Sequence, residues 1–363
     1  MGSDKGLESR FILSSAFGRS RCFPGSLRQR IVMDFLRGAR IAFALAVGVV
    51  GCCLCPAAFA ADESAGSSVA ASFAAFWQAA KGRPFAQQLD AWDRDIEAPH
   101  RDLYASVVWE ASQHQDWQAR RMRFLQARFA AYPALAADIL TEELALRRML
   151  DQQIPRFHRA FPDADLQPPV QLLLAPNFDA KSGVLADGRP VLAFAVDSLL
   201  LEKADLGIVV PHELFHLYHA KHAGFSNDGV MPGVALTVPL FEEGLATYVS
   251  SQLSPGHDDS ALLLQVDLGD IPASRLAGIA HRFLADARFK AIDSEHPEAF
   301  KKWFNAAAAP YQQDLPNRTG YWLGLQVIRH LRRTCSLKQI AAWTPAQADA
   351  KVRVALGELA RIP

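Results

Sequence analysis

The sequence predicts an α+β protein that is mostly helical, with a small sheet in the middle of the chain. Apolar residues recur at spacings of three and four from Val69 to about Phe161, as they do in amphipathic helices. Two short apolar runs, Val170 to Leu174 and Val191 to Val196, have the length and composition of strands. Beyond Phe241 the helical spacing returns and continues almost to the end of the chain.

The composition excludes one broad class of function. The 363 residues include 38 Lys+Arg and 38 Asp+Glu, and 50% of them are hydrophobic. This length is enough to bury a full core and allows two domains. Because the basic residues are balanced and scattered, the chain lacks the basic surface of a nucleic-acid-binding protein.

The N-terminus has the pattern of an export signal. An apolar run over residues 41–60 follows two arginines and ends in an Ala-Phe-Ala cleavage pattern. Counted from Met33, residues 33–60 form a signal peptide, and we interpret residues 1–32 as a disordered stretch upstream of the true start. The mature protein is therefore expected to be periplasmic or secreted.

Two alternatives to cleavage after Ala60 remain open. The apolar run is just long enough to stay in the bilayer as an anchor. The sequence Val49-Val50-Gly51-Cys52 also resembles a bacterial lipobox, which would leave a lipid on Cys52. Apart from these two routes we expect no contact with a membrane. With residues 1–60 removed, Cys335 is the remaining cysteine, so we expect neither an internal disulfide nor a cysteine-based zinc site.

The mature chain divides into two regions at about residue 165. Residues 61–165 are expected to form a helical N-terminal region, and residues 166–363 a second region that combines strands and helices. Within the first region the expected core residues include Met122, Leu125, Phe129, Trp92, Trp109 and Trp117. Between the two predicted strands, Pro176 to Pro190 contains several glycines and is predicted to be a loop.

One short motif carries most of the functional information. His212-Glu213-Leu214-Phe215-His216 matches H-E-x-x-H, in which two histidines four residues apart lie on one face of a helix and can bind one metal ion. Glu213 lies about 100° further round the helix, where its carboxylate can take a proton from a water on the metal. Two imidazoles and one carboxylate suit zinc, so we predict one Zn²⁺ per chain.

A second motif supplies a third metal ligand. The run Glu243-Gly244-Leu245-Ala246-Thr247-Tyr248 resembles the E-G-[FL]-A-x-Y stretch of the gluzincin metallopeptidases, whose glutamate binds the metal. The resemblance therefore implies that Glu243 is the third ligand. Glu242 precedes it at a place where aminopeptidase-type members usually have Asn. The chain looks closest to a bacterial family of predicted zinc-dependent proteases of unknown function, and the resemblance covers roughly Val170 to Ile328.

The same resemblance implies a fold and further site residues. It implies a zincin-like catalytic domain with a small mixed sheet, in which Val191 to Val196 is the edge strand that pairs with an extended substrate. Tyr321 is the candidate donor to the oxyanion of the reaction, because similar enzymes place a tyrosine on a later helix that faces the metal. Arg318 is a weaker candidate for holding a carboxylate of the substrate.

A metzincin pattern competes for the third ligand. His212, His216 and His222 have the required spacing and Met231 follows, but His219 occupies the place of the glycine that turns the chain back toward the metal. Without that turn His222 is expected to face away. His219 shares the face of the ligands, where packing in the core is the simplest interpretation.

Pro211 departs from the gluzincin pattern at the position before the first histidine. Proline has no N–H group to donate, so we expect the helix to be kinked or to start late at this residue.

These observations favour an exported zinc metallopeptidase that acts on peptides or proteins, with Glu213 as the general base. Two alternatives stay open: a zinc-dependent hydrolase of a non-peptide amide or ester, and a non-catalytic binding protein with a zincin fold. Metal content and digestion of a peptide library would separate the three.

Overall fold

The computed structural model describes most of the chain from residue 68 onward. The described residues are 68–165, 170–225, 233–293, 295–305 and 311–362. The predictions for residues 1–32, the signal peptide 33–60, cleavage after Ala60, lipidation of Cys52 and the role of Met231 lie outside these residues. Within them, no helix combines the length and the apolar character needed to cross a membrane.

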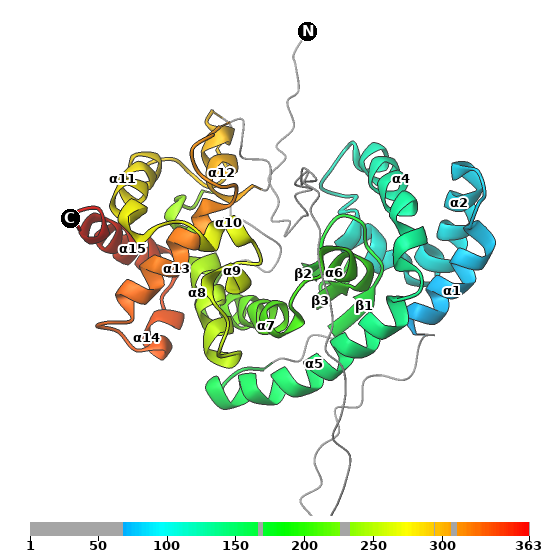
Figure 1. The fold of residues 1–363 in the computed structure, drawn as a ribbon, viewed down its shortest axis with the longest axis horizontal. Coiled ribbons are helices and arrows are strands. Elements are labelled where there is room, and N and C mark those ends of the chain that lie inside the picture. Colours follow the sequence, from blue (N-terminus) through cyan, green and yellow to red (C-terminus); the bar gives the residue numbers. More distant parts are fainter. Residues whose placement is uncertain (1–67, 166–169, 226–232, 294, 306–310, 363) are drawn as a thin grey trace, which may run out of the picture. The chain divides into compact units, whose positions relative to one another are not determined.

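The helical N-terminal region is present as the periodicity predicts (Figure 1). Its helices and helical turns are α1 (Val69–Ala80), α2 (Phe85–Trp92), a π-helical turn (Asp93–Glu97), a 3₁₀ turn (Ala98–His100), α3 (Arg101–Leu103), a second π-helical turn (Tyr104–Val108), α4 (Trp117–Leu135) and α5 (Ile139–Ala160). Leu125 and Phe129 of the predicted stripe are buried together with Trp92 and Trp109. Met122 is 40% exposed, so its assignment to the core is wrong.

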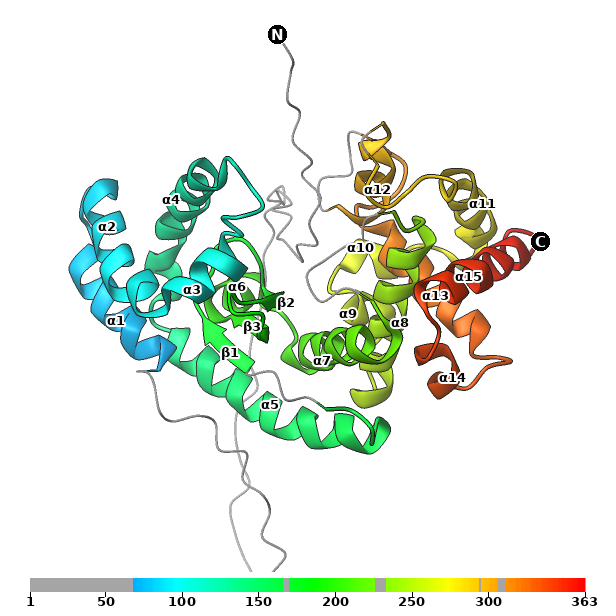
Figure 2. The same ribbon diagram turned by 180° about the vertical axis from the view of Figure 1, so that it is seen from behind.

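A three-stranded mixed sheet follows this region (Figure 2). It consists of β1 (Val170–Leu173), β2 (Ala180–Val184) and β3 (Pro190–Ala195), in the order β1-β3-β2. β1 pairs with β3 in parallel, and β2 pairs with β3 in antiparallel fashion. A small mixed sheet is thus confirmed, but β3 is its central strand. The prediction that Val191 to Val196 forms the edge is wrong, because β3 is paired on both sides and is buried from Val191 to Ala195.

The edge strand β2 occupies part of the segment that we expected to be a loop. The chain returns from β2 to β3 through a tight turn at Asp187-Gly188, where Gly188 has φ of 86°. Leu185 accepts a hydrogen bond from the Gly188 amide and donates its own to the carbonyl of Arg189. Asp-Gly is a common hairpin pair because glycine tolerates positive φ. Pro176 to Pro190 is therefore largely a β-hairpin strand and its turn.

The helical N-terminal region packs on the sheet and holds it in place. The Tyr104 hydroxyl donates to the carbonyl of Leu174 at 2.7 Å, and the Asn177 side chain donates to the carbonyl of Val108 at 2.7 Å. Gly183 of β2 lies directly against Val107, since a Cβ on the glycine would stand 3.0 Å from the valine methyl groups. The second π-helical turn thus covers β2.

A buried polar cluster joins α4 to the segment that follows the sheet. Arg128 donates to the carbonyl of Asp197 at 2.8 Å and to the hydroxyl of Ser198 at 2.7 Å. The Asp197 carboxylate accepts hydrogen bonds from the Tyr132 hydroxyl and from the Ala175 amide, both at 2.9 Å, and forms an ion pair with Arg128. The charges of this cluster are satisfied by one another, as buried charges require.

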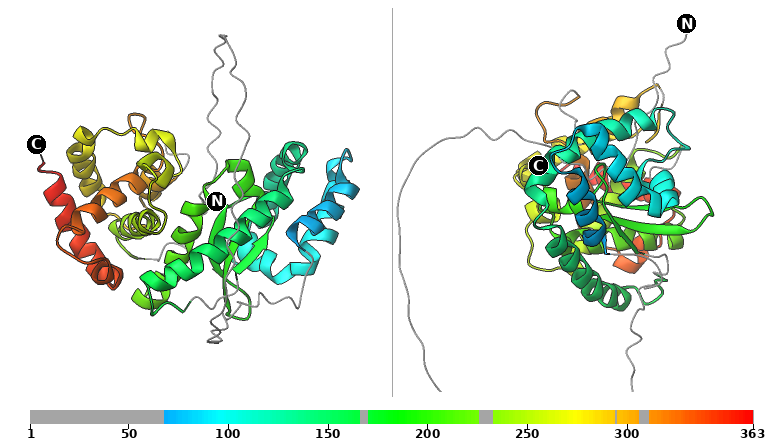
Figure 3. Two further views of the ribbon diagram at one scale, coloured as in Figure 1. Left: turned by 60° about the horizontal axis from the view of Figure 1, so that its bottom comes forward. Right: turned by 90° about the vertical axis from the view of Figure 1, so that its right-hand side faces the viewer.

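The remainder of the chain is helical (Figure 3). Its helices and 3₁₀ turn are α6 (Val196–Glu202), α7 (Leu206–Ala223), α8 (Thr237–Leu253), α9 (Asp259–Leu262), α10 (Val266–Gly269), a 3₁₀ turn (Ala273–Arg275), α11 (Leu276–Asp286), α12 (Pro297–Phe304), α13 (Thr319–Leu331), α14 (Leu337–Ala341) and α15 (Pro345–Leu359). α8 packs against α7, α13 and α15, and α7 also contacts α5 and β2. The two predicted motifs lie on the adjacent helices α7 and α8.

Candidate metal centre

Helix α7 continues through its internal proline without a late start. It begins at Leu206, where the Asp205 side chain accepts a hydrogen bond from the Gly207 amide at 2.9 Å. Pro211 cannot donate to the carbonyl of Gly207, which lies four residues earlier. The Ser254 hydroxyl, at the end of α8, donates to that carbonyl instead. The expectation that the helix starts late at Pro211 is therefore wrong.

Two serines of α8 connect this helix to α7. Besides Ser254, the hydroxyl of Ser250 donates to the carbonyl of Ile208 at 3.1 Å. Gln153 of α5 donates to the Ser254 hydroxyl at 3.0 Å, so the connection extends to a third helix. These bonds fix the first turn of α7 against the end of α8.

The donor atoms of His212, His216 and Glu243 converge on one point. The Nε2 atoms of the two histidines are 3.0 Å apart, and the Oε2 atom of Glu243 lies 3.3 Å from the first and 3.7 Å from the second. Among the described residues this is the group of three or more His, Cys, Asp or Glu residues that can hold a metal ion. Helix α7 supplies both imidazoles and α8 supplies the carboxylate.

This donor set fits zinc. Donors at about 2.0–2.2 Å from a tetrahedral ion lie about 3.3–3.6 Å from one another, close to the three separations here. The two ring nitrogens and the carboxylate oxygen all lie within 4.8 Å of one another. His212 and Glu243 are buried, while the side chain of His216 is 22% exposed, which leaves solvent a route to the centre.

Two glycines place Glu243 and Tyr321 on the same side of a helix crossing. A Cβ on Gly244 would lie 2.3 Å from the carbonyl carbon of Gly324, and a Cβ on Gly324 would lie 2.4 Å from the carbonyl oxygen of Leu240. The backbones of α8 and α13 therefore touch at this crossing. Gly244 is adjacent to Glu243, and Tyr321 is one turn before Gly324. The close approach thus brings the tyrosine toward the metal centre.

The charges of the centre depend on one another. Burial acts to raise the pKa of Glu243, but the charge of His216 and the hydrogen bonds from both histidines outweigh it and lower the pKa to about 2. Burial acts to lower the pKa of His216, but Glu243 outweighs it and raises the pKa to about 9. Glu243 is therefore ionised at neutral pH, as a ligand to a cation must be.

Three further carboxyl groups near the centre are shifted toward their neutral form. Burial raises the pKa of Glu213, although His216 and His212 act to lower it. Burial also raises the pKa of Glu242 to about 8. Burial, and then the charges of Glu202 and Glu213, raise the pKa of Asp179, which lies at the start of β2. A general base with a raised pKa suits proton transfer at neutral pH.

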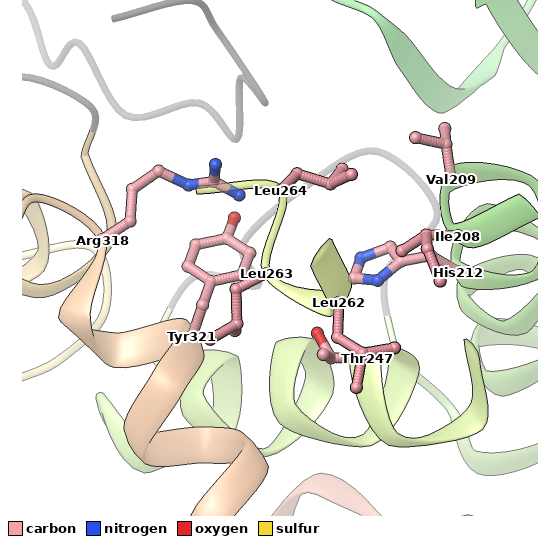
Figure 4. Close-up of a pocket in the computed structure, with 9 residues that line it drawn as sticks. All are labelled: Ile208, Val209, His212, Thr247, Leu262, Leu263, Leu264, Arg318 and Tyr321. Atoms are coloured by element: carbon pink, nitrogen blue, oxygen red, sulfur yellow. The ribbon is translucent and has the colours of Figure 1, made fainter. Parts of the chain in front are cut away.

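A small pocket, partly open to solvent, lies beside His212 (Figure 4). Apart from His212 and Thr247, α7 and α9 line it with apolar residues, and α13 contributes Tyr321 and Arg318. In the close-up, the His212 ring points into the pocket from one side, and the Tyr321 hydroxyl lies on the other side beneath the Arg318 guanidinium. Burial, followed by the charge of Glu243, raises the pKa of Tyr321, so the hydroxyl keeps its proton.

The remaining histidine predictions are resolved by packing. His222 lies away from the donor group, with its ring nitrogens 2.9 Å from the carbonyl of Tyr218 and 3.0 Å from the carbonyl of Asp163. His219 is buried and stacks on Phe225 with ring centroids 3.9 Å apart. It packs in the core, as its position on the helix predicts, and burial lowers its pKa to about 3.

Several residues that position the site were not identified from the sequence. Gly320 and Gly324 have the G-x-x-x-G spacing that allows helices to approach closely, and Gly320 lies against Phe304 of α12 while Gly324 lies against α8. The Asp187-Gly188 pair could have indicated the hairpin that makes β2 the edge strand. No local signal distinguishes Ser254 or Asp179, because their roles depend on contacts with distant segments.

Comparison of the chain with family models, curated proteins and solved structures finds no match. The resemblance to the gluzincins therefore rests on the two motifs alone.

Proposed function

We propose that the protein is an exported zinc metallopeptidase of the gluzincin type, with a zincin-like catalytic domain in residues 166–363. One observation carries the proposal: the donor atoms of His212, His216 and Glu243 meet at separations that suit zinc, next to the buried carboxyl of Glu213. Export rests on the signal-like N-terminus, which lies outside the described residues.

Each residue near the centre has a role in peptide hydrolysis. When bound, zinc supplies a Lewis acid that polarises a carbonyl and makes water acidic enough to attack it at neutral pH. Glu213 accepts the proton of the attacking water and delivers it to the leaving amine. Tyr321 keeps its proton and donates a hydrogen bond to the developing oxyanion.

The sheet provides a binding surface for the peptide backbone. β2 is an edge strand of the described sheet and contacts α7, which carries both histidines. An extended peptide can add to such an edge through main-chain hydrogen bonds. We therefore assign to β2 the substrate-pairing role that the sequence had assigned to Val191 to Val196.

The substitution Glu213→Gln tests the proposal directly. It removes the base and keeps the shape, so zinc should stay bound at about one equivalent while kcat/KM for peptides falls about 10²- to 10⁴-fold. Zinc content by mass spectrometry and hydrolysis of a peptide library would be measured on the same preparation. Undiminished hydrolysis by the variant would show that Glu213 is not the base. If the wild type hydrolysed esters but not peptides, the substrate would be an ester rather than a peptide.

A matched pair of neighbouring glutamates tests the metal site. Glu243→Gln should lower zinc affinity strongly, because it removes a charged ligand, whereas Glu242→Gln should leave the stoichiometry at one. Zinc titration of both variants with a competing chelator measures the difference. Equal affinity in the two variants would exclude Glu243 as a ligand.

A further inference from the structure

Arg318 is a buried cation that no described carboxylate neutralises. The residue is 7% exposed and sits at the start of α13 with φ of 60°. Its guanidinium lies over the ring of Tyr321, 4.2 Å from the centroid, and interacts with the tyrosine hydroxyl. Its Nε atom is buried without a hydrogen-bond partner, and within the described residues the side chain forms no ion pair.

Such a group is costly for folding alone. A buried charge without a counter-charge loses hydration free energy that a hydrogen bond with a neutral hydroxyl returns only in part, and a buried donor without an acceptor adds to that loss. A cation–π contact offsets only part of this cost. The buried guanidinium of Arg318 thus destabilises the protein when no ligand is bound. This cost indicates a ligand that provides the missing counter-charge and hydrogen-bond acceptor.

The position of the guanidinium selects the chemistry of that ligand. Arg318 and His212 line the same pocket, so a group bound by Arg318 lies beside the metal centre (Figure 4). The planar fork of arginine matches the two oxygens of a carboxylate and binds it through paired hydrogen bonds. Between the two residues the wall is apolar, formed by Ile208, Val209 and residues 262–264.

We propose that Arg318 binds a carboxylate of the substrate while an apolar side chain of the same substrate residue packs against the apolar wall between Arg318 and His212. This inference rests on the proposed function and narrows it to peptides that present a carboxylate close to the cleaved bond. The apolar wall favours a C-terminal residue, whose free carboxylate adjoins an apolar side chain. An acidic side chain is the other source of the same group, and the experiment separates the two.

Binding of small ligands tests the inference without any hydrolysis. The probes are N-acetyl-leucine, its amide N-acetyl-leucinamide, and the α-amide of N-acetyl-glutamic acid, whose single carboxylate is on the side chain. Affinities would be measured by calorimetry on the mature chain after treatment with a chelator, so that the carboxylate cannot bind zinc directly. We expect N-acetyl-leucine to bind about 10- to 100-fold more tightly than its amide, as a hydrogen-bonded charge pair provides.

Three variants assign the effect to the guanidinium. Arg318→Ala should abolish the preference for the acid over the amide, and Arg318→Lys should keep a reduced preference because the charge remains without the fork. Arg333→Ala, which removes an exposed arginine just beyond the same helix, should keep the full preference. Circular dichroism confirms that each variant is folded, and Arg318→Gln replaces any variant that is not.

The outcomes are distinct. Equal binding of acid and amide by the wild type, or a preference that survives in Arg318→Ala, overturns the inference. Tighter binding of the glutamate derivative than of N-acetyl-leucine, lost in Arg318→Ala, supports the carboxylate site and assigns it to an acidic side chain. Because no turnover is needed, failure here leaves the Glu213→Gln test intact, and failure of that test leaves this result readable.

Discussion

Two buried arginines show how differently this protein uses the same side chain. Arg128 in the helical N-terminal region is 6% exposed, and its guanidinium meets the carboxylate and carbonyl of Asp197 and the hydroxyl of Ser198. Arg318 beside the metal centre is 7% exposed and has a buried Nε atom that donates to nothing described. The two arginines are equally buried, but only Arg128 is paired within the fold. Arg128 is therefore a structural charge, whereas the guanidinium of Arg318 is available to a ligand.

The largest expected effect comes from breaking the satisfied cluster. Asp197→Ala leaves Arg128 buried without its carboxylate and removes the acceptor for Tyr132 and for the Ala175 amide. We expect the free energy of unfolding to fall by about 3–5 kcal/mol, as when one partner of a buried pair is removed. Urea denaturation measures the change.

Asp116→Ala provides the control for this substitution. Asp116 is exposed at the start of α4 and makes no capping hydrogen bond with its side chain, so its loss should change stability by less than about 0.5 kcal/mol. A loss below about 1 kcal/mol for Asp197→Ala would show that the cluster is not a structural element.

His219 is a second unpartnered buried group, and its effect depends on pH. Burial lowers its pKa to about 3, below the value of about 6.5 expected in the unfolded chain. Between these values the unfolded chain binds a proton that the folded protein does not. Stability from this residue is therefore complete above pH 6.5 and declines as the pH falls, by about 3 kcal/mol at pH 4.

Replacing the ring isolates this contribution. His219→Phe should remove it, so that the difference in unfolding free energy between wild type and variant changes between pH 6.5 and pH 4. A constant difference for His219→Phe would mean that the fold does not lower the pKa of this histidine.

Glycine substitutions test the close approach of α8 and α13 near Tyr321. Gly244→Ala forces the backbones of α8 and α13 apart, so we expect a loss of about 1–3 kcal/mol in stability and weaker zinc binding. Gly357→Ala in α15 meets no atom within 4 Å and should stabilise the protein by about 0.4–1 kcal/mol. Unfolding curves and zinc titrations would be measured for both variants. If both substitutions stabilised the protein, or both destabilised it, the close contact between α8 and α13 would be contradicted.

The smallest expected effect concerns Arg318 itself. Arg318→Met removes a buried charge that has no described partner and keeps an apolar side chain of similar length. The loss of the cation–π contact with Tyr321 offsets part of the gain, so stability should rise by less than about 1 kcal/mol. Thermal unfolding of Arg318→Met and Asp197→Ala under the same conditions compares the two buried arginines. A large loss of stability in Arg318→Met would show that Arg318 also supports the fold.

The parts of the fold that the sequence predicts are those that local geometry determines. The spacing within α4 and α5 indicates helices, and four residues of separation place His212 and His216 on one face whatever surrounds them. The edge of the sheet depends on which strands pair, and that is decided by contacts between distant segments. The burial of Arg318 and the contact of Gly244 with Gly324 are non-local in the same way.

The serine bonds between α7 and α8 have a consequence for handling the protein. Ser250 and Ser254 join the two ligand-bearing helices through backbone carbonyls, and a buried apolar core surrounds them. These contacts use none of the donor atoms of His212, His216 and Glu243, so we expect the fold to survive chelation, unlike small zinc domains that unfold without their metal. Dialysis against a chelator followed by cobalt should consequently yield a coloured, reloaded protein from the same folded stock.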